Sequence, residues 1–181
     1  MDILAHALWA GAGTAYAARR IPISRPVAVA TVALAVLPDI VQMLPLIPWA
    51  VAGGGTLAEL HAFVIAVPGQ EPALPPLVAL FSHHLHCIMH SAVVATGVTL
   101  LLWLPRRRFW IPLAGWWSHI VIDVFTHSAD YYAVPVLYPF SERGFDGLAW
   151  NTPWFLALNY AVLAVTILWL VLTRRRSTNL P

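Results

Sequence analysis

The sequence has no lysine, a single cysteine and few charged side chains of any kind. Asp, Glu, Lys and Arg make up 10% of its 181 residues, whereas a soluble domain carries roughly 25%. Hydrophobic residues account for 60% of the chain, and the mean hydropathy is +0.74. These values predict a polytopic membrane protein, and the length predicts a single domain. The one cysteine, Cys87, excludes an internal disulfide.

A secretion signal and a nucleic-acid surface are also missing. The stretch from Met1 to His6 contains an acid and no positively charged region, so a cleavable signal peptide is not expected. All ten basic residues are arginines, and most lie in three short clusters beside apolar runs. Clusters at such places act as orientation signals in membrane proteins. The sequence pI near 9.0 therefore does not indicate a nucleic-acid partner.

Five apolar runs predict an all-α membrane helical bundle with about five membrane segments. The runs cover about residues 3–18, 26–50, 76–104, 109–127 and 153–173. A full span needs about 20 residues, so the first segment is short. We expect residues 1–176 to form one membrane-embedded domain and residues 177–181 to form a disordered tail.

Two irregular stretches interrupt this pattern. Proline at Leu37-Pro38-Asp39 is expected to kink the second run, because proline frees backbone groups inside a helix. The linker 51–75 is expected to contain a short interfacial helix from Thr56 to Val67, with Thr56 as N-cap and Glu59 at the capping-box position.

The arginine clusters also predict the orientation of the chain. They lie at residues 19–25, 106–108 and 174–176, which five membrane segments would place on one side. The positive-inside rule makes that side cytoplasmic. We therefore expect a multi-pass protein of the inner (cytoplasmic) membrane, in contact with the lipid bilayer, with its N-terminus outside and its C-terminus inside.

A stripe of polar side chains is the main candidate for chemistry. His119, Asp123 and His127 recur every fourth residue within an otherwise apolar run. On a helix, residues four apart lie along one face. Burying a carboxylate there is costly unless it is paired, hydrogen-bonded or bound to a cation. The stripe therefore predicts a metal or catalytic site.

Other segments contribute residues of the same chemical type. His86 and His90 form a second pair four residues apart, Asp39 follows the expected kink, and His6 belongs to the first run. The complete candidate metal-binding set is His6, Asp39, His86, His90, His119, Asp123 and His127. Mixed histidine and carboxylate ligands suit zinc most, with manganese or iron as alternatives. Asp39 and Asp123 are also the candidate catalytic carboxylates, as ligand or base.

Taken in order, these motifs resemble a known family. They are Asp2-Ile-Leu-Ala-His6, Leu37-Pro38-Asp39-Ile40, His86 to His90-Ser91, and His119-x3-Asp123 with Thr126-His127. The set resembles the membrane-bound metal-dependent hydrolases, a family of small inner-membrane proteins, and more remotely the zinc-dependent phospholipases C. The resemblance implies a bound divalent metal and hydrolysis of a phosphoester or a lipid. The family's arginine in the third segment has no counterpart between His86 and His90.

Two other functions use the same residues. A haem b or electron-transfer protein would need axial histidines at matched depth, such as His86 with His119, and would not need the buried carboxylates. A metal or proton carrier would place the same groups along a path across the membrane. The scarcity of ionisable groups in the inner third of the later segments speaks against the carrier.

Overall fold

The computed structural model describes residues 1–66, 70, 72–130 and 133–178, and side chains as far as Thr173. These residues form helices and no strands, which confirms the all-α fold class. The helices are α1 (Ile3–Ala17), α2 (Arg25–Gln42), α3 (Leu46–Ala52), α4 (Leu57–Val64), α5 (Pro76–Met89), α6 (Ala92–Arg106), α7 (Leu113–Thr126) and α8 (Pro153–Thr178).

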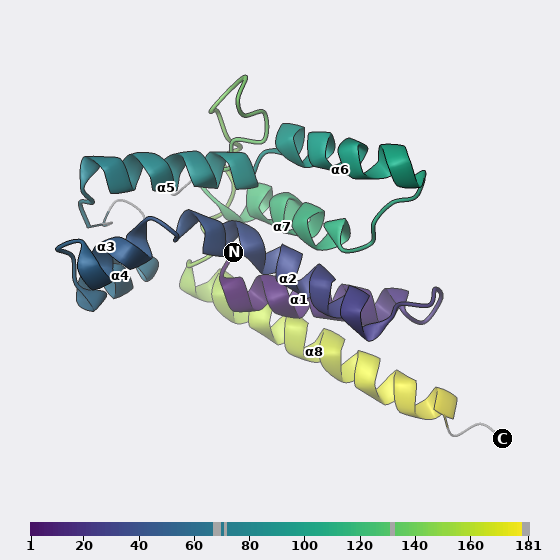
Figure 1. Ribbon diagram of the computed structural model, residues 1–181. Helices are drawn as coiled ribbons and strands as arrows, with labels where there is room; N and C mark the ends of the chain where they lie inside the picture. Colours follow the sequence, from purple (N-terminus) through teal and green to yellow (C-terminus); the bar gives the residue numbers. More distant parts are fainter. Residues whose placement is uncertain (67–69, 71, 131–132, 179–181) are drawn as a thin grey trace.

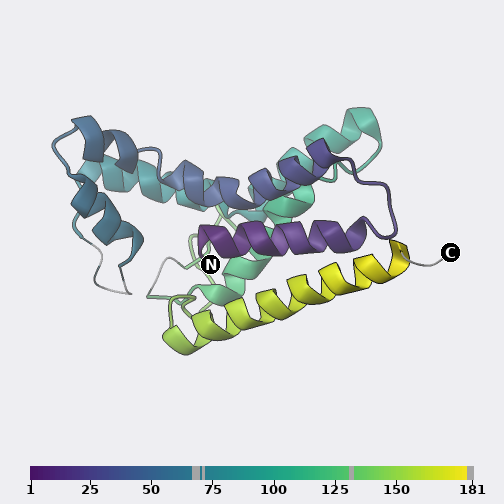
Figure 2. The same cartoon turned by 90° about the horizontal axis from the view of Figure 1, so that it is seen from below.

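Helix α2 lies at the centre of the bundle and contacts α1, α5 and α7. Helices α5 and α6 follow one another along one side, with α7 packed beneath α6 (Figure 1). Helix α1 lies between α2 and α8 (Figure 2). The short helices α3 and α4 form a separate pair at the far end of α5. The central position of α2 brings its Asp39 face toward α1, α5 and α7 together.

The third apolar run is not one helix, as the sequence predicted, but two. The chain leaves helical geometry at His90 and Ser91, and α5 and α6 meet at a bend of 57°. The Ser91 hydroxyl accepts a hydrogen bond from Val94 N (3.1 Å) and donates one to the carbonyl oxygen of Tyr138 (2.6 Å). This N-cap starts a new helix, and the break leaves the His90 side chain in the interior.

The second run also divides at an unexpected place. Helix α2 continues through Pro38 to Gln42, and the chain turns only at residues 43–45 before α3 begins. The predicted short helix of the linker is confirmed as α4, with the full capping box between Thr56 and Glu59, and its place at the membrane interface stays a prediction. That helix ends at Val64, and its predicted end at Val67 lies outside the described residues.

Two helices in the described part of the chain are long and apolar enough to cross a membrane. They are α2 and residues Pro153–Thr173 of α8, and the bent α5–α6 pair makes a third if it counts as one broken span. Helix α1 has 15 residues and α7 has 14, which at 1.5 Å per residue is only about 20 Å each. Helix α8 runs on to Thr178. Residues 179–181 lie outside the description, so the disordered tail stays a prediction.

The contact between α2 and α7 is unusually close at Gly115. A Cβ atom at this position would overlap the carbonyl oxygen of Thr31 and approach Ala35 N at 3.1 Å. Glycine lets the two helix backbones touch, as small residues do in membrane bundles. One turn further along α7, His119 thereby reaches the carbonyl oxygen of Ala35 (2.7 Å).

The loop after α7 pairs with the end of that helix. Leu148 N donates to Phe125 O (3.0 Å), Trp150 N to Thr126 O (2.8 Å) and Gly147 N to His127 O (2.9 Å). These bonds satisfy carbonyl groups that a helix end leaves without intrahelical partners. The loop therefore fixes the backbone of His127 and of the two residues before it.

We expect the substitution Gly115→Ala to destabilise the bundle, because the added methyl group forces α7 away from α2. Overpacking of this kind costs typically about 1–3 kcal/mol. The matched control is Gly97→Ala in α6, where a Cβ atom meets nothing within 4 Å. Thermal unfolding of the detergent-purified protein should show a lower midpoint for Gly115→Ala only. Equal midpoints for the two variants would contradict the close contact.

Candidate metal centre

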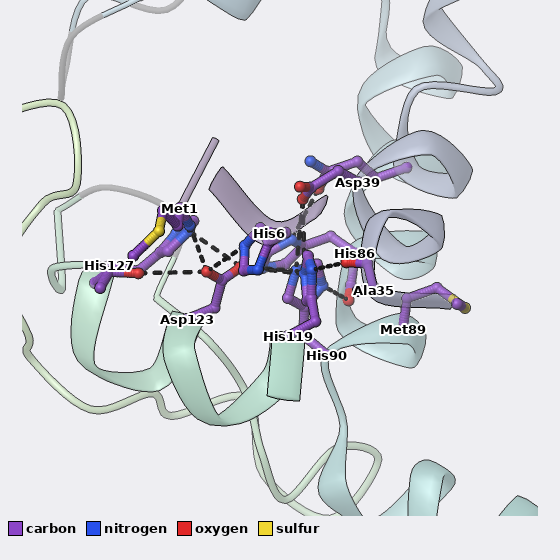
Figure 3. A network of polar contacts seen from close by, with 12 residues as sticks. Met1, His6, Ala35, Asp39, His86, Met89, His90, His119, Asp123 and His127 are labelled. Carbon is purple, nitrogen blue, oxygen red and sulfur yellow. Dashed lines mark hydrogen bonds and ion pairs between the residues drawn. The ribbon is translucent and has the colours of Figure 1, made fainter. Parts of the chain in front are cut away.

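Asp123 lies at the centre of the polar cluster (Figure 3). Its side chain is fully buried, and its Oδ2 atom makes no hydrogen bond. Three imidazole Nε2 atoms nevertheless surround Oδ2: those of His119 at 3.2 Å, His90 at 3.4 Å and His127 at 3.5 Å. A buried carboxylate oxygen so placed is costly without a cation nearby.

The other oxygen of Asp123 faces a different set of groups. The amino group of Met1 donates to Oδ1, and His6 Nε2 lies 2.9 Å from it. The hydroxyl of Thr126 approaches the same oxygen at 3.3 Å. The two oxygens of one carboxylate therefore face different groups, except that His127 lies near both: its Nε2 atom is 3.5 Å from Oδ2 and 3.2 Å from the Met1 amino group.

Asp39 completes a converging set on the Oδ2 side. Its Oδ1 atom lies 3.7 Å from His119 Nε2 and 3.9 Å from His90 Nε2. One ligand atom each from Asp39, His90, His119 and Asp123 lies within 4.8 Å of all the others, and all four residues are buried. The set draws on α2, the C-cap of α5 and α7.

Backbone carbonyl groups determine which nitrogen of each central imidazole carries a proton. His119 Nδ1 lies 2.7 Å from Ala35 O, and His90 Nδ1 lies 2.9 Å from His86 O. A carbonyl oxygen only accepts, so each Nδ1 donates and each Nε2 of the neutral ring presents a lone pair. These two Nε2 atoms face one another at 2.9 Å. Two lone pairs at this distance repel unless a cation lies between them.

The donor set fits a divalent metal ion. Zinc bonds to nitrogen and oxygen of about 2.0–2.2 Å place neighbouring ligand atoms roughly 3–3.5 Å apart. The separations among His90, His119 and Asp123 are 2.9–3.4 Å, and Asp39 lies slightly further out. Orientation of each histidine through its second nitrogen is typical of protein metal sites.

The remaining predicted residues surround this set. His86 hydrogen-bonds Gln42 through Nδ1 (2.8 Å), and its ring centre lies 4.1 Å from that of His90. His6 stacks on His119 with ring centres 3.8 Å apart. The structure thus brings all seven predicted residues into one region, although their roles as ligands stay predictions.

His127 reaches the cluster in a way the helical stripe did not predict. Helix α7 ends at Thr126, and His127 has extended backbone angles (φ −118°, ψ 141°). Its position is therefore set by the helix end and the paired loop, not by a third helical turn.

Sequence reasoning missed several groups that orient the cluster. The carbonyl oxygens of Ala35 and His86 hold the two central imidazoles, and the Met1 amino group contacts Asp123. Backbone groups leave no trace in residue types. Gln42 could have been identified from the sequence, because it is a polar residue three positions after Asp39 in an apolar helix and therefore lies on the same face as Asp39.

No arginine contributes to this buried cluster among the described side chains. The chain has no lysine, and every arginine whose side chain is described is exposed. Any negatively charged substrate would therefore meet positive charge only from bound cations or from the Met1 amino group.

This fold and this cluster define a small helical membrane protein with a buried histidine–aspartate centre. The family model described as YdjM inner membrane protein matches residues 1–180, and the chain belongs to that family. Neither a curated protein nor a solved structure matches the chain. The family's description confirms the expected inner-membrane location. The family's description names a location and no reaction, so the hydrolase activity stays a prediction.

We expect the purified protein to bind a divalent metal ion, and the substitution Asp123→Ala to abolish binding while the bundle stays folded. The affinity should fall by more than the ~10–100-fold typical of outer-shell substitutions, because the Asp123 carboxylate lies within 3.5 Å of four imidazole Nε2 atoms. The control is Asp130→Ala, an exposed acid in the loop after α7. Metal content by inductively coupled plasma mass spectrometry is the measurement. Stoichiometric metal retained by Asp123→Ala would contradict the assignment.

Proposed function

We propose that the protein is a metal-dependent hydrolase of the inner membrane that cleaves a phosphoester bond in a membrane lipid. The observation that supports this most is the pair of imidazole Nε2 lone pairs, 2.9 Å apart, beside the fully buried Asp123. A divalent cation acts as a Lewis acid and makes water a better nucleophile near neutral pH. Zinc is the preferred ion, with manganese or iron as alternatives.

The positions of the residues support a different role for each in the proposed reaction. His90, His119 and Asp123 hold the ion, and the carbonyl groups of Ala35 and His86 keep the two imidazoles in the tautomer that this requires. Asp39 stands at the edge of the set. Its side chain is 10% exposed, and its Oδ2 atom makes no hydrogen bond. This oxygen is suited to accept a proton from the attacking water.

An apolar cleft formed by α1, α2 and α7, the helices that carry His6, Asp39 and Asp123, supports a lipid substrate. It has a volume of about 430 Å³, within the roughly 300–1,000 Å³ of small-molecule sites. On α7 its walls include Ser118 and Ile122, the residues next to His119 and Asp123. The lining residues are Trp9, Ala10, Gly13, Thr14, Thr31, Ala114, Ser118 and Ile122. Such a lining suits an acyl chain better than a sugar or a nucleotide.

We further propose the topology expected from the arginines: five membrane segments, with the N-terminus outside and the metal centre in the outer half of the bilayer. In this arrangement α5 and α6 form one broken segment, and α1 and α7 are short segments supported by their neighbours. The lipid bond that is cleaved would then belong to the outer leaflet.

The topology predicts which engineered cysteines a membrane-impermeant maleimide reaches in intact spheroplasts. In a Cys87→Ser background, Asp130→Cys should be labelled from outside, whereas Arg107→Cys should be labelled only after lysis. Both parent residues are exposed. The reverse pattern would invert the orientation, and labelling of both from outside would contradict the number of segments.

Activity should appear in vesicles of phosphatidylethanolamine and phosphatidylglycerol that contain the protein and zinc or manganese. We expect products of phosphoester cleavage by mass spectrometry, and a loss of about 10²–10⁴-fold in Asp39→Asn, the range of general-base contributions. The exposed Asp130→Asn variant is the control. No hydrolysis by the fully metal-loaded protein would contradict the function.

Filling the cleft should separate lipid cleavage from the chemistry itself. Gly13→Leu places a side chain in the cleft, and Gly97→Leu places one on α6 away from it; a Cβ atom is unhindered at both positions. We expect Gly13→Leu to reduce cleavage of the lipid but not of water-soluble p-nitrophenyl phosphate. Equal lipid activity in both variants would show that the acyl chain lies elsewhere.

The other two functions receive no comparable support. The haem function paired His86 with His119, but the structure places His90 against His119, and Nε2 atoms 2.9 Å apart leave no room for a porphyrin. The carrier requires groups spread across the membrane, whereas the described histidines and aspartates of this set gather in one buried cluster.

A further inference from the structure

The carboxylate of Asp123 points its two oxygens toward different sets of nitrogen atoms. Oδ2 faces His90 and His119 of the converging set. Oδ1 faces the Met1 amino group and His6 Nε2. His127 Nε2 lies between the two sides, 3.5 Å from Oδ2 and 3.2 Å from the same amino group. A carboxylate in this arrangement is placed to bridge two positive charges.

His6 lacks the partners that a buried imidazole normally has. Its side chain is fully buried, and neither ring nitrogen makes a hydrogen bond. The stacking against His119 fixes the ring, and Nε2 lies 2.9 Å from Asp123 Oδ1 without hydrogen-bond geometry. An imidazole nitrogen held beside a carboxylate oxygen without hydrogen-bond geometry is placed as two ligands of one cation are placed.

Positive charge already lies at this position in the structure. The amino group of Met1 is buried between Asp123 Oδ1 and His127 (Figure 3). The protein therefore stabilises a cation on the Oδ1 side of Asp123, just as the facing imidazoles require one on the Oδ2 side.

The charges of the cluster also favour a second cation. Asp39 and Asp123 together carry two negative charges, which one divalent ion only neutralises. No described arginine side chain is buried near them, so the single charge of the Met1 amino group is all that would face the added negative charge of a phosphoester. Two-metal sites solve this problem by stabilising both the attacking and the leaving oxygen atoms.

We propose a second divalent cation site, formed by His6, His127 and the Oδ1 atom of Asp123, at the place where the Met1 amino group lies. Asp123 is then a bridging carboxylate between two ions, and the amino group gives up its position to the second ion. This inference rests on the metal centre of the proposed function, but its test depends on stoichiometry and not on activity.

The first measurement is the number of zinc ions bound by the full-length protein in detergent. We expect two equivalents in the unaltered protein, one in His6→Gln and one in His127→Gln. His84→Gln is the matched control, because His84 lies on α5 outside the cluster and contacts Tyr138; it should keep two. Circular dichroism and gel filtration identify any variant that fails to fold. If one of the two site variants fails to fold, the zinc count of the other still tests the second site.

The second measurement identifies the bridge. Manganese-loaded protein should give the electron paramagnetic resonance spectrum of two spin-coupled ions, and His6→Gln should give that of a single ion. One equivalent in both the unaltered protein and His6→Gln, with an uncoupled spectrum, would overturn the second site and leave the first intact. No bound metal in the unaltered protein would overturn both, so the two failures are distinguishable.

Discussion

A carboxylate without access to water is the constraint on which this structure depends. Asp123 is fully buried in an apolar bundle, where an unpaired charge is strongly unfavourable. The neighbouring elements place imidazole nitrogens around it, His6 from α1, His90 from the end of α5 and His119 from α7 itself, and the Met1 amino group supplies positive charge. The tertiary structure can be understood as the arrangement that surrounds this one side chain with nitrogen atoms.

Breaks in the helices make that arrangement possible. At the end of α5, the side chain and the backbone N–H of His90 both use the carbonyl oxygen of His86. The end of α7 has a similar effect on His127. The close backbone contact at Gly115 is a third feature that shapes the cluster, because it brings α7 near enough to α2 for His119 to reach the carbonyl oxygen of Ala35. Irregular geometry is thus concentrated where the chemistry lies, as in other membrane proteins.

The sequence predicted which residues form the site better than it predicted how they are arranged. The spacing of His119 and Asp123 identified a common helix face, and the scarcity of charge elsewhere marked these residues as unusual. It did not reveal the break at His90, because no glycine or proline lies between Leu77 and Thr96 to mark it. Nor did it reveal the carbonyl acceptors, which every residue possesses. Helix α2 passes through Pro38 because its packing against α1, α5 and α7 overrides the local preference.

The position of α8 has a consequence for biosynthesis. This helix attaches to α1 through Trp9–Asn159 and Asp2–Tyr160 hydrogen bonds, yet it provides none of the seven histidine and aspartate side chains. All of them precede residue 128, so the ribosome has synthesised the whole set before the last transmembrane helix emerges. The final helix is therefore made last, and its contribution is to pack against α1 and not to supply a residue of the cluster.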